Sequence, residues 1–168
     1  MSQTTSSPAQ GSWLSILLSG QPHQVIGEDP RDPYLRRWFL WPRNRFVNLY
    51  GHLFEHSDPP PIHNHPWPFL TIVVKGSYLE VTRTGVIERR AGSVAFRRSQ
   101  HSHRIMLPTD AEGHDIPCIT VVLTGPRRRH WGFWCPGSTK TDEERFVPWE
   151  QFGSRGCGEP HPGKEIQT

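Results

Sequence analysis

The chain has 168 residues, 34% of them hydrophobic, which is enough for one domain with one compact core. Its 17 Pro, 15 Gly, 7 Trp and 8 Phe favour short strands joined by turns over long helices, so we predict an all-β fold. The net charge of +3 suits an acidic ligand but is too modest to indicate nucleic acid, which we do not expect as a partner.

The cysteines indicate the redox state that we expect. Cys118, Cys135 and Cys157 show neither paired nor CxxC spacing, so the sequence indicates neither a disulfide framework nor a thiolate zinc site. We therefore predict reduced thiols in a protein of the cytoplasm.

Both ends of the chain are polar and rich in Ser, Gly and Pro. Residues 1–12 and 154–168 contain too little apolar material to pack, and we predict that both are disordered. Residues 13–153 form the predicted domain. The apolar run at 13–18 is short and follows no basic region, so we predict a helical turn packed on the domain rather than a signal peptide or a membrane span.

Strand-like alternation begins at Tyr34. In the stretch that follows, Asn48, Tyr50 and His52 fall on one face of a predicted strand, and aliphatic residues fall on the other. A polar and aromatic face either lines a pocket or faces solvent, and the pattern alone fits both.

The rest of the chain continues as short strands separated by turns. Residues 63–82 predict two strands with a break at Gly76, and residues 85–107 predict two or three more. After a polar loop, residues 118–125 and 127–136 predict a final pair of strands around a Gly-Pro turn. Because no βαβ alternation occurs, this spacing predicts a sandwich or a barrel.

Two histidines, His63 and His65, lie two positions apart on a predicted strand. Their side chains therefore project from the same face, where their ring nitrogens can converge on one metal ion. A His-x-His pair also occurs on exposed strands. Here, however, the pair precedes an apolar segment, and a second pair, His101 and His103, lies on a later strand.

Two motifs resemble those of the cupin superfamily in order and spacing. The first cupin motif has His-x-His and a later glycine, as His63, His65 and Gly76 do. The second has a glycine that opens a strand and a histidine eleven positions later, as Gly92 and His103 do.

The resemblance implies a single cupin-type β-barrel over about residues 34–150, with one metal ion on His63, His65 and His103. Where many cupins carry a glutamate ligand, this chain has an apolar stretch at 68–70, so the pattern gives three histidines and no carboxylate. In this respect the chain is similar to the three-His cupins, among them the thiol dioxygenases. It also resembles small cupins of bacteria and phages, and the resemblance leaves the substrate open.

Three neutral imidazoles leave the full 2+ charge on a divalent ion, so anionic ligands should bind it well. Fe(II) on such ligands supports oxygenation of a chelated substrate, whereas Zn(II) supports hydrolysis. We predict a small non-haem Fe(II)-dependent dioxygenase that acts on a small polar or acidic molecule, with Zn, Mn or Ni as alternative metals. A non-catalytic metal-dependent binding cupin and a metal-free isomerase or epimerase are the alternative functions.

Further residues are candidates for the pocket. Tyr50, His52 and His101 are candidates to exchange protons with a substrate or hydrogen-bond it. His101 also fits a partner that orients His103, a surface residue, or the third ligand in place of His103. The predicted substrate-binding residues, each of which also fits a surface or core position, are Arg45, Asn48, Trp67, Phe69 and Thr71.

The expected partners follow from the same features. A small, anionic substrate suits the site, and we expect no membrane. Because cupins frequently pair through edge strands, the aromatic segments 34–41 and 130–136 are candidates for a dimer contact. We therefore expect a homodimer.

Overall fold

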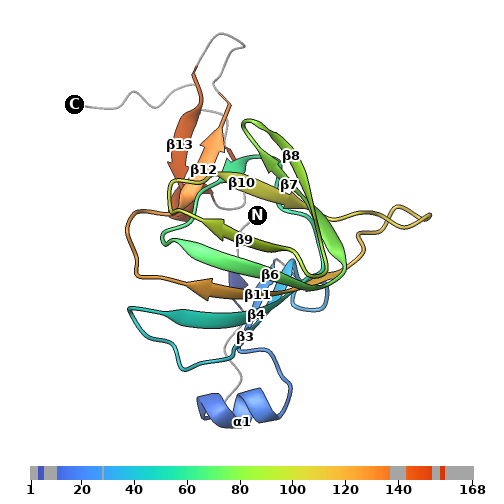
Figure 1. The fold of residues 1–168 in the computed structure, drawn as a ribbon, viewed down its shortest axis with the longest axis vertical. Helices are drawn as coiled ribbons and strands as arrows, with labels where there is room; N and C mark the ends of the chain where they lie inside the picture. Colours follow the sequence, from blue (N-terminus) through green and yellow to red (C-terminus); the bar gives the residue numbers. More distant parts are fainter. Residues whose placement is uncertain (1–3, 6–10, 28, 137–142, 153–155, 158–168) are drawn as a thin grey trace.

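The computed structural model describes residues 4–5, 11–27, 29–136, 143–152 and 156–157. They form two antiparallel sheets that face each other as the walls of a barrel (Figure 1). The larger sheet has the order β1 (Thr4–Thr5), β2 (Gln24–Gly27), β3 (Leu35–Phe39), β4 (Asn48–Phe54), β11 (Cys118–Thr124), β6 (Phe69–Lys75) and β9 (Val94–Arg97). The smaller sheet has the order β13 (Arg145–Pro148), β12 (Gly132–Cys135), β5 (Ile62–His63), β10 (His103–Met106), β7 (Ser77–Thr82) and β8 (Gly85–Arg90). The prediction of a single all-β barrel is confirmed.

Alternation along the strands separates the inner from the outer face of the barrel. In β4 every second residue, from Asn48 to Phe54, is buried, and β11 shows the same alternation. The core between the sheets consists of buried side chains from both walls, namely Leu35, Phe54, Val73, Tyr78, Ile105, Leu107 and Cys118. The predicted face with Asn48, Tyr50 and His52 therefore points inward.

Glycine permits the tight connection between β6 and β7. Gly76 has φ of 80°, and a Cβ at this position would lie 2.9 Å from the carbonyl oxygen of Pro117. The predicted break at this glycine is confirmed, since β6 ends and β7 begins beside it.

The strands β11 and β12 do not pair, so the predicted final pair is wrong. β11 lies between β4 and β6 in the larger sheet, whereas β12 pairs with β5 and β13 in the smaller one. The segment that connects β11 to β12 crosses from one sheet to the other alongside the residues before β6. There Gly125 N donates to Pro68 O (2.8 Å) and Arg128 N donates to Pro66 O (2.6 Å). β13, which the alternation did not predict, is the partner of β12.

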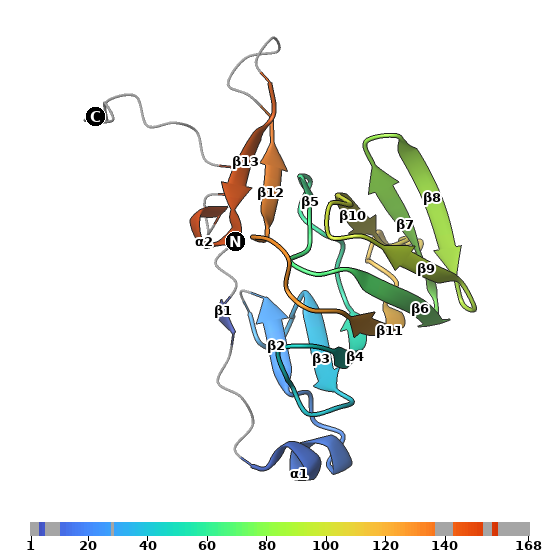
Figure 2. The ribbon, with the colours of Figure 1, turned by 60° about the vertical axis from the view of Figure 1, so that its left-hand side comes forward.

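Two short helices flank the barrel (Figure 2). α1 (Trp13–Leu18) is the predicted helical turn: Ser12 caps its N-terminus, Ile16 is buried, and Trp13 Nε1 donates to Phe39 O of β3 at 2.7 Å. α2 (Trp149–Phe152) follows β13 and packs Phe152 on Phe133 with ring centroids 3.7 Å apart. Among the described residues, no helix has the length and apolar character needed to span a membrane.

The structure describes only parts of the two ends that we predicted to be disordered. Within residues 1–12, Thr4 and Thr5 pair with Ile26 and Gly27 as strand β1, and Ser12 caps α1. Within 154–168, residues 156–157 are described. The rest of both predictions lies outside the described residues.

A disulfide bond joins Cys135 of β12 to Cys157. The prediction of reduced thiols is therefore wrong for these two cysteines, and the argument from thiols to the cytoplasm loses its basis. The two residues are 22 positions apart, which no local motif marks, and the turn after α2 brings them together. Cys118 is a free, buried thiol, and burial raises its pKa to about 11.

Reduction of this disulfide is expected to lower the free energy of unfolding by about 3 kcal/mol, because the bond closes a loop of 22 residues in the unfolded chain. Denaturant unfolding with and without reductant measures the change. Cys157→Ser should remove the response to reductant, and Cys118→Ser should keep it. Equal stability with and without reductant, together with a free Cys135 thiol by mass spectrometry, would contradict the bond.

Candidate metal centre

The three predicted histidine ligands come together on the smaller sheet. His63 ends β5 and pairs directly with His103 of β10 across the antiparallel ladder. His65 follows two residues after His63, and its side chain turns toward the same point. Their ligand nitrogens all lie within 4.8 Å of one another, and His65 Nε2 is 2.9 Å from His103 Nε2.

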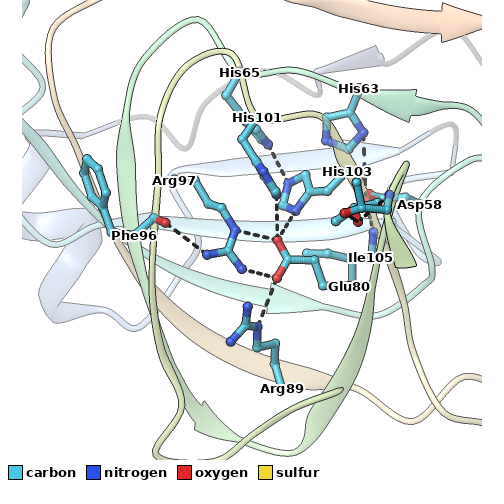
Figure 3. Close-up of polar contacts among 12 residues, drawn as sticks. Asp58, His63, His65, Glu80, Arg89, Phe96, Arg97, His101, His103 and Ile105 are labelled. Carbon is cyan, nitrogen blue, oxygen red and sulfur yellow. Dashed lines mark hydrogen bonds and ion pairs between the residues drawn. The ribbon is translucent and has the colours of Figure 1, made fainter. Parts of the chain in front are cut away.

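A buried glutamate, Glu80 of β7, holds His103 from behind (Figure 3). Its side chain is 1% exposed, and its Oε1 lies 3.0 Å from His103 Nδ1. Because the Nδ1 proton of His103 is donated to this carboxylate, the Nε2 lone pair is left for a metal ion.

Glu80 also belongs to a second cluster, with His101 and His103, whose ligand atoms are equally close. Both of its oxygens are already engaged. Arg97 donates to both of them, Nε at 2.6 Å to Oε1, while Arg89 Nε donates to Oε2 at 3.0 Å and His101 Nε2 lies 3.0 Å from Oε1. Glu80 therefore accepts hydrogen bonds from imidazoles and guanidinium groups and does not serve as a metal ligand.

The charge of Glu80 is fixed by these contacts. Burial alone raises the pKa of Glu80, but hydrogen bonds from His103 and Arg97 outweigh it and hold the pKa well below its usual range. The carboxylate is thus ionised and remains an acceptor.

Asp58 stands behind His63 in a similar way. Its Oδ2 is 3.9 Å from His63 Nδ1, an ion-pair distance rather than a hydrogen bond, and it accepts from Ile105 N at 2.5 Å. The hydroxyl of Tyr34 donates to its other oxygen. Since Nδ1 of His63 faces Asp58, the Nε2 atom is left for the cluster.

Burial keeps two of the imidazoles neutral. It lowers the pKa of His63 to about 4, although the nearby Asp58 charge acts in the opposite direction. Burial also lowers the pKa of His65 well below its usual value, and the neighbouring histidines and Arg37 lower it further. Neutral imidazoles with converging lone pairs are the donors that Fe(II), Zn(II) and similar ions prefer, so the residues fit a metal centre.

A cavity of about 280 Å³ lies between the sheets and is lined by the three histidines. This volume is just below the usual range for ligand pockets, so it suits a small molecule. Aromatic and aliphatic side chains from both sheets form most of its wall, namely Ile26, Leu35, Tyr50, Phe54, Phe69, Tyr78, Ile105, Val122 and Phe133.

This chain matches solved structures but no known sequence family. No family model matches it, and no curated protein matches it. Among solved structures, the polyketide cyclase RemF from Streptomyces resistomycificus matches with a TM-score of 0.51 at 16% identity, over 62% of this chain and 74% of that one. An RmlC-like cupin from Shewanella frigidimarina matches with a TM-score of 0.45 at 18% identity, over 57% and 79%. KdgF from Halomonas sp. matches with a TM-score of 0.46 at 15% identity, over 60% and 87%.

The chain has a cupin fold. The two cupin motifs lie where the resemblance placed them, since His63 and His65 stand at the end of β5, Gly76 turns between β6 and β7, and Gly92 turns between β8 and β9 before His103. At these levels of identity the likeness concerns the fold, and the reaction must be argued from the site.

The structure places most of the predicted pocket residues at the cavity. Tyr50 and His52 of β4 line it, and so do the three residues predicted to follow His65 as its wall, Trp67, Phe69 and Thr71. His101 contacts Glu80 and does not line the cavity, which fits the interpretation that it supports His103.

Two predicted substrate-binding residues lie elsewhere. Arg45 is exposed, with its guanidinium 4.8 Å from the ring centroid of Phe46. Asn48 is buried, but its amide nitrogen donates to Asn44 O and its amide oxygen accepts from Asn44 N, both at 2.9 Å. The amide of Asn48 is therefore already satisfied by the loop before β4, and Arg45 lies outside the cavity. Neither position supports a role in substrate binding.

Sequence reasoning missed three charged residues of the site, Arg37, Asp58 and Glu80. For Glu80 a signal existed, because Tyr78 and Glu80 share the inward face of β7 and a charge on that face requires partners. Arg37 lies within a segment that we interpreted as a dimer contact, and Asp58 lies in the loop between β4 and β5.

Acidification of the metal-free protein is expected to destabilise it. The unfolded His63 gains its proton near pH 6.5 and the folded one only near pH 4, so stability is fully present above pH 6.5 and is lost as the pH falls toward 4. The shift corresponds to about 3 kcal/mol. Denaturant unfolding with a chelator at pH 7 and pH 4.5 should show a smaller loss in His63→Gln than in the native chain, and equal losses would contradict the neutral His63.

Proposed function

We propose that this protein is a small non-haem metalloenzyme, an Fe(II)-dependent dioxygenase acting on a small polar or acidic molecule that binds to the ion. The observation that carries the proposal is the convergence of His63, His65 and His103 on one wall of a cavity between the two sheets. Three neutral ligands leave the charge of the ion uncompensated, which favours an anionic substrate.

The protein supplies orientation of the ligands and an apolar environment around them. Glu80 holds His103 through a hydrogen bond, and Asp58 lies 3.9 Å behind His63, so His103 is oriented before the metal arrives. Aromatic rings surround the imidazoles: the ring centroid of Phe69 is 4.5 Å from that of His65, and that of Phe133 is 5.5 Å from that of His63. When bound, Fe(II) would supply redox chemistry with dioxygen that these side chains cannot supply.

His52 is the candidate for proton transfer. Burial lowers its pKa well below the usual value, and the charge of Arg37 lowers it further, so the imidazole is neutral near pH 7. It lines the cavity on the wall opposite β10, within the same enclosure as the substrate. Tyr50 stacks on it with ring centroids 5.8 Å apart and restricts its orientation.

Oxygen consumption tests the proposal. The chain is loaded with Fe(II) without oxygen and mixed with small amino, hydroxy and thiol acids in an oxygen-electrode cell. We expect uptake with at least one acid, dependent on iron and absent in His65→Ala. A chain that holds one iron, binds the acids and consumes no oxygen would instead be a binding protein, and one that retains no metal would favour the isomerase or epimerase alternative.

The proposed partners include a second copy of the chain. In the two aromatic segments expected at a dimer contact, the most exposed large hydrophobic side chain is Trp41, at 61%. Exposed apolar residues also gather on the outer face of β6 and the edge strand β9, namely Ile72, Val74, Val94 and Phe96. Light scattering should give twice the chain mass of 19.3 kDa, and a single 19.3 kDa species would contradict the dimer.

A further inference from the structure

One cation faces the cavity from the wall opposite the metal centre. Arg37 lies on β3, lines the cavity, and places its guanidinium 5.1 Å from the ring centroid of Tyr50. Among the described residues, no carboxylate lies within ion-pair distance of it. Its neighbour on the outer face, Arg36, by contrast pairs with Glu55 at 2.5 Å. A partly buried guanidinium without a counter-ion is costly, and a ligand that supplies a counter-ion is stabilised.

The hydrogen bonds of Arg37 leave one edge of its guanidinium free. Nε donates to His52 Nε2 at 2.9 Å, and Nη1 donates to Gln24 Oε1 at 3.2 Å. Neither partner carries a charge that neutralises the arginine. Nη2 has no hydrogen-bond partner among the described residues and is available to an acceptor in the cavity.

The same contact fixes the tautomer of His52. Because Nε2 accepts from Arg37, the proton of the neutral ring is on Nδ1, which is a buried donor without an acceptor in the described chain. Thr120 Oγ1 is a second such group. His52 is 7% exposed and Thr120 is 0% exposed. Bulk water therefore cannot supply a hydrogen bond to the His52 ring or to the Thr120 hydroxyl.

These groups form one polar row across the larger sheet. The register pairs Gln24 with Arg37, Arg37 with His52, and His52 with Thr120, so the four side chains lie side by side on four neighbouring strands. Every group in the row that lacks a partner can donate a hydrogen bond. A row of unsatisfied donors around one cation is complementary to an anion.

The other charged residue of the cavity wall does not compete for Arg37. The two oxygens of Asp58 accept from the hydroxyl of Tyr34 and from Ile105 N, and Asp58 faces His63. Arg37 and the three histidines line the same cavity, from opposite walls. Both ends of a small molecule can therefore be held within the 280 Å³ of this cavity.

We propose that Arg37, with His52 and Thr120 beside it, is a carboxylate-binding subsite, so that the substrate is a small carboxylic acid anchored at Arg37 and presented to the three-histidine centre by its other end. The inference rests on the proposed function for the reaction at that other end. Carboxylate binding itself needs no reaction. A phosphate is the less suitable anion, because the cavity is small and Nε and Nη1 of the arginine are already engaged.

Binding of butanoate and of its neutral analogue butanamide tests the subsite. Trp67, Trp131 and Trp149 line the cavity, so a tryptophan fluorescence titration of the purified, metal-loaded chain reports both ligands. We expect butanoate to bind at least about 10-fold more tightly than butanamide, since hydrogen bonds to a charged group are among the strongest in proteins. Arg37→Met should lose this preference, and Arg36→Met, its neighbour on the outer face, should keep it.

Two further variants keep the outcome decisive. In His65→Ala the metal centre is broken, and the preference for butanoate should persist, which separates this subsite from the proposed oxygenase. Butanoate binding that persists in Arg37→Met and disappears in His65→Ala would show that the carboxylate is a metal ligand, and would overturn the proposal. Should Arg37→Met fail to fold by circular dichroism, Arg37→Lys decides: it keeps the cation but not the fork, and undiminished preference there would contradict the role of the guanidinium.

Discussion

The His103→Ala variant is expected to lose the metal ion that the native chain carries. His103 is the histidine that links the centre to its support, since His65 Nε2 lies 2.9 Å from its Nε2 and Glu80 holds its Nδ1. Removing one of three protein ligands leaves two imidazoles, which no longer hold a divalent ion against water and buffer. We expect about one metal per native chain and at least about 100-fold weaker binding in this variant.

Metal analysis by mass spectrometry, on protein purified without a metal-affinity tag, measures this loss. His63→Ala and His65→Ala should behave in the same way. His101→Ala is the matched control, because His101 contacts Glu80 but does not line the cavity. Metal that stays in His103→Ala and leaves His101→Ala would mean that the ligand assignment is shifted by two residues along the strand.

Replacing Glu80 by leucine is expected to destabilise the fold by about 3–5 kcal/mol. Glu80 is the acceptor for Arg89, Arg97, His101 and His103, and its loss leaves Arg97, whose side chain is only 12% exposed, as a buried charge without a counter-ion. Breaking one side of a buried ion pair has effects of this size. Denaturant unfolding of the metal-free protein measures the difference and excludes indirect effects of metal loss.

Two variants control this measurement. Glu88→Gln removes a carboxylate from the neighbouring strand β8 that pairs with Arg90 on the surface, and little change is expected. Combining Glu80→Leu with Arg97→Met removes both charges and should recover part of the lost stability. A single Glu80→Leu variant as stable as the native chain would show that the cluster contributes nothing to the fold.

The metal centre could be predicted from the sequence because its determinants are local. His63 and His65 share a face at the strand period, and the eleven positions from Gly92 to His103 cover one turn and one strand of a barrel. The cavity wall from Trp67 to Thr71 followed from the same period.

The supporting residues could not be predicted because long-range pairing brings them together. Glu80 and Arg97 are 17 residues apart and meet between strands β7 and β9 of the two different sheets, and Cys135 pairs with Cys157 without any spacing signal. Arg37 and Thr120 are separated by about half of the chain, and only the order of strands β3, β4 and β11 aligns them. Which of these residues become neighbours depends on the order of the strands in the sheets, which the sequence pattern does not indicate.

The row of Gln24, Arg37, His52 and Thr120 makes the cavity sensitive to changes in chain length. These four side chains face inward only because four strands are in register, and successive residues of a strand point to opposite faces. Inserting or deleting one residue in β3 or β4 would turn Arg37 or His52 to the outer face while leaving the composition almost unchanged. Extra residues in the exposed loop between β10 and β11 would leave the row intact. Tolerance of insertions along this chain should therefore follow strand register more closely than it follows distance from the three histidines.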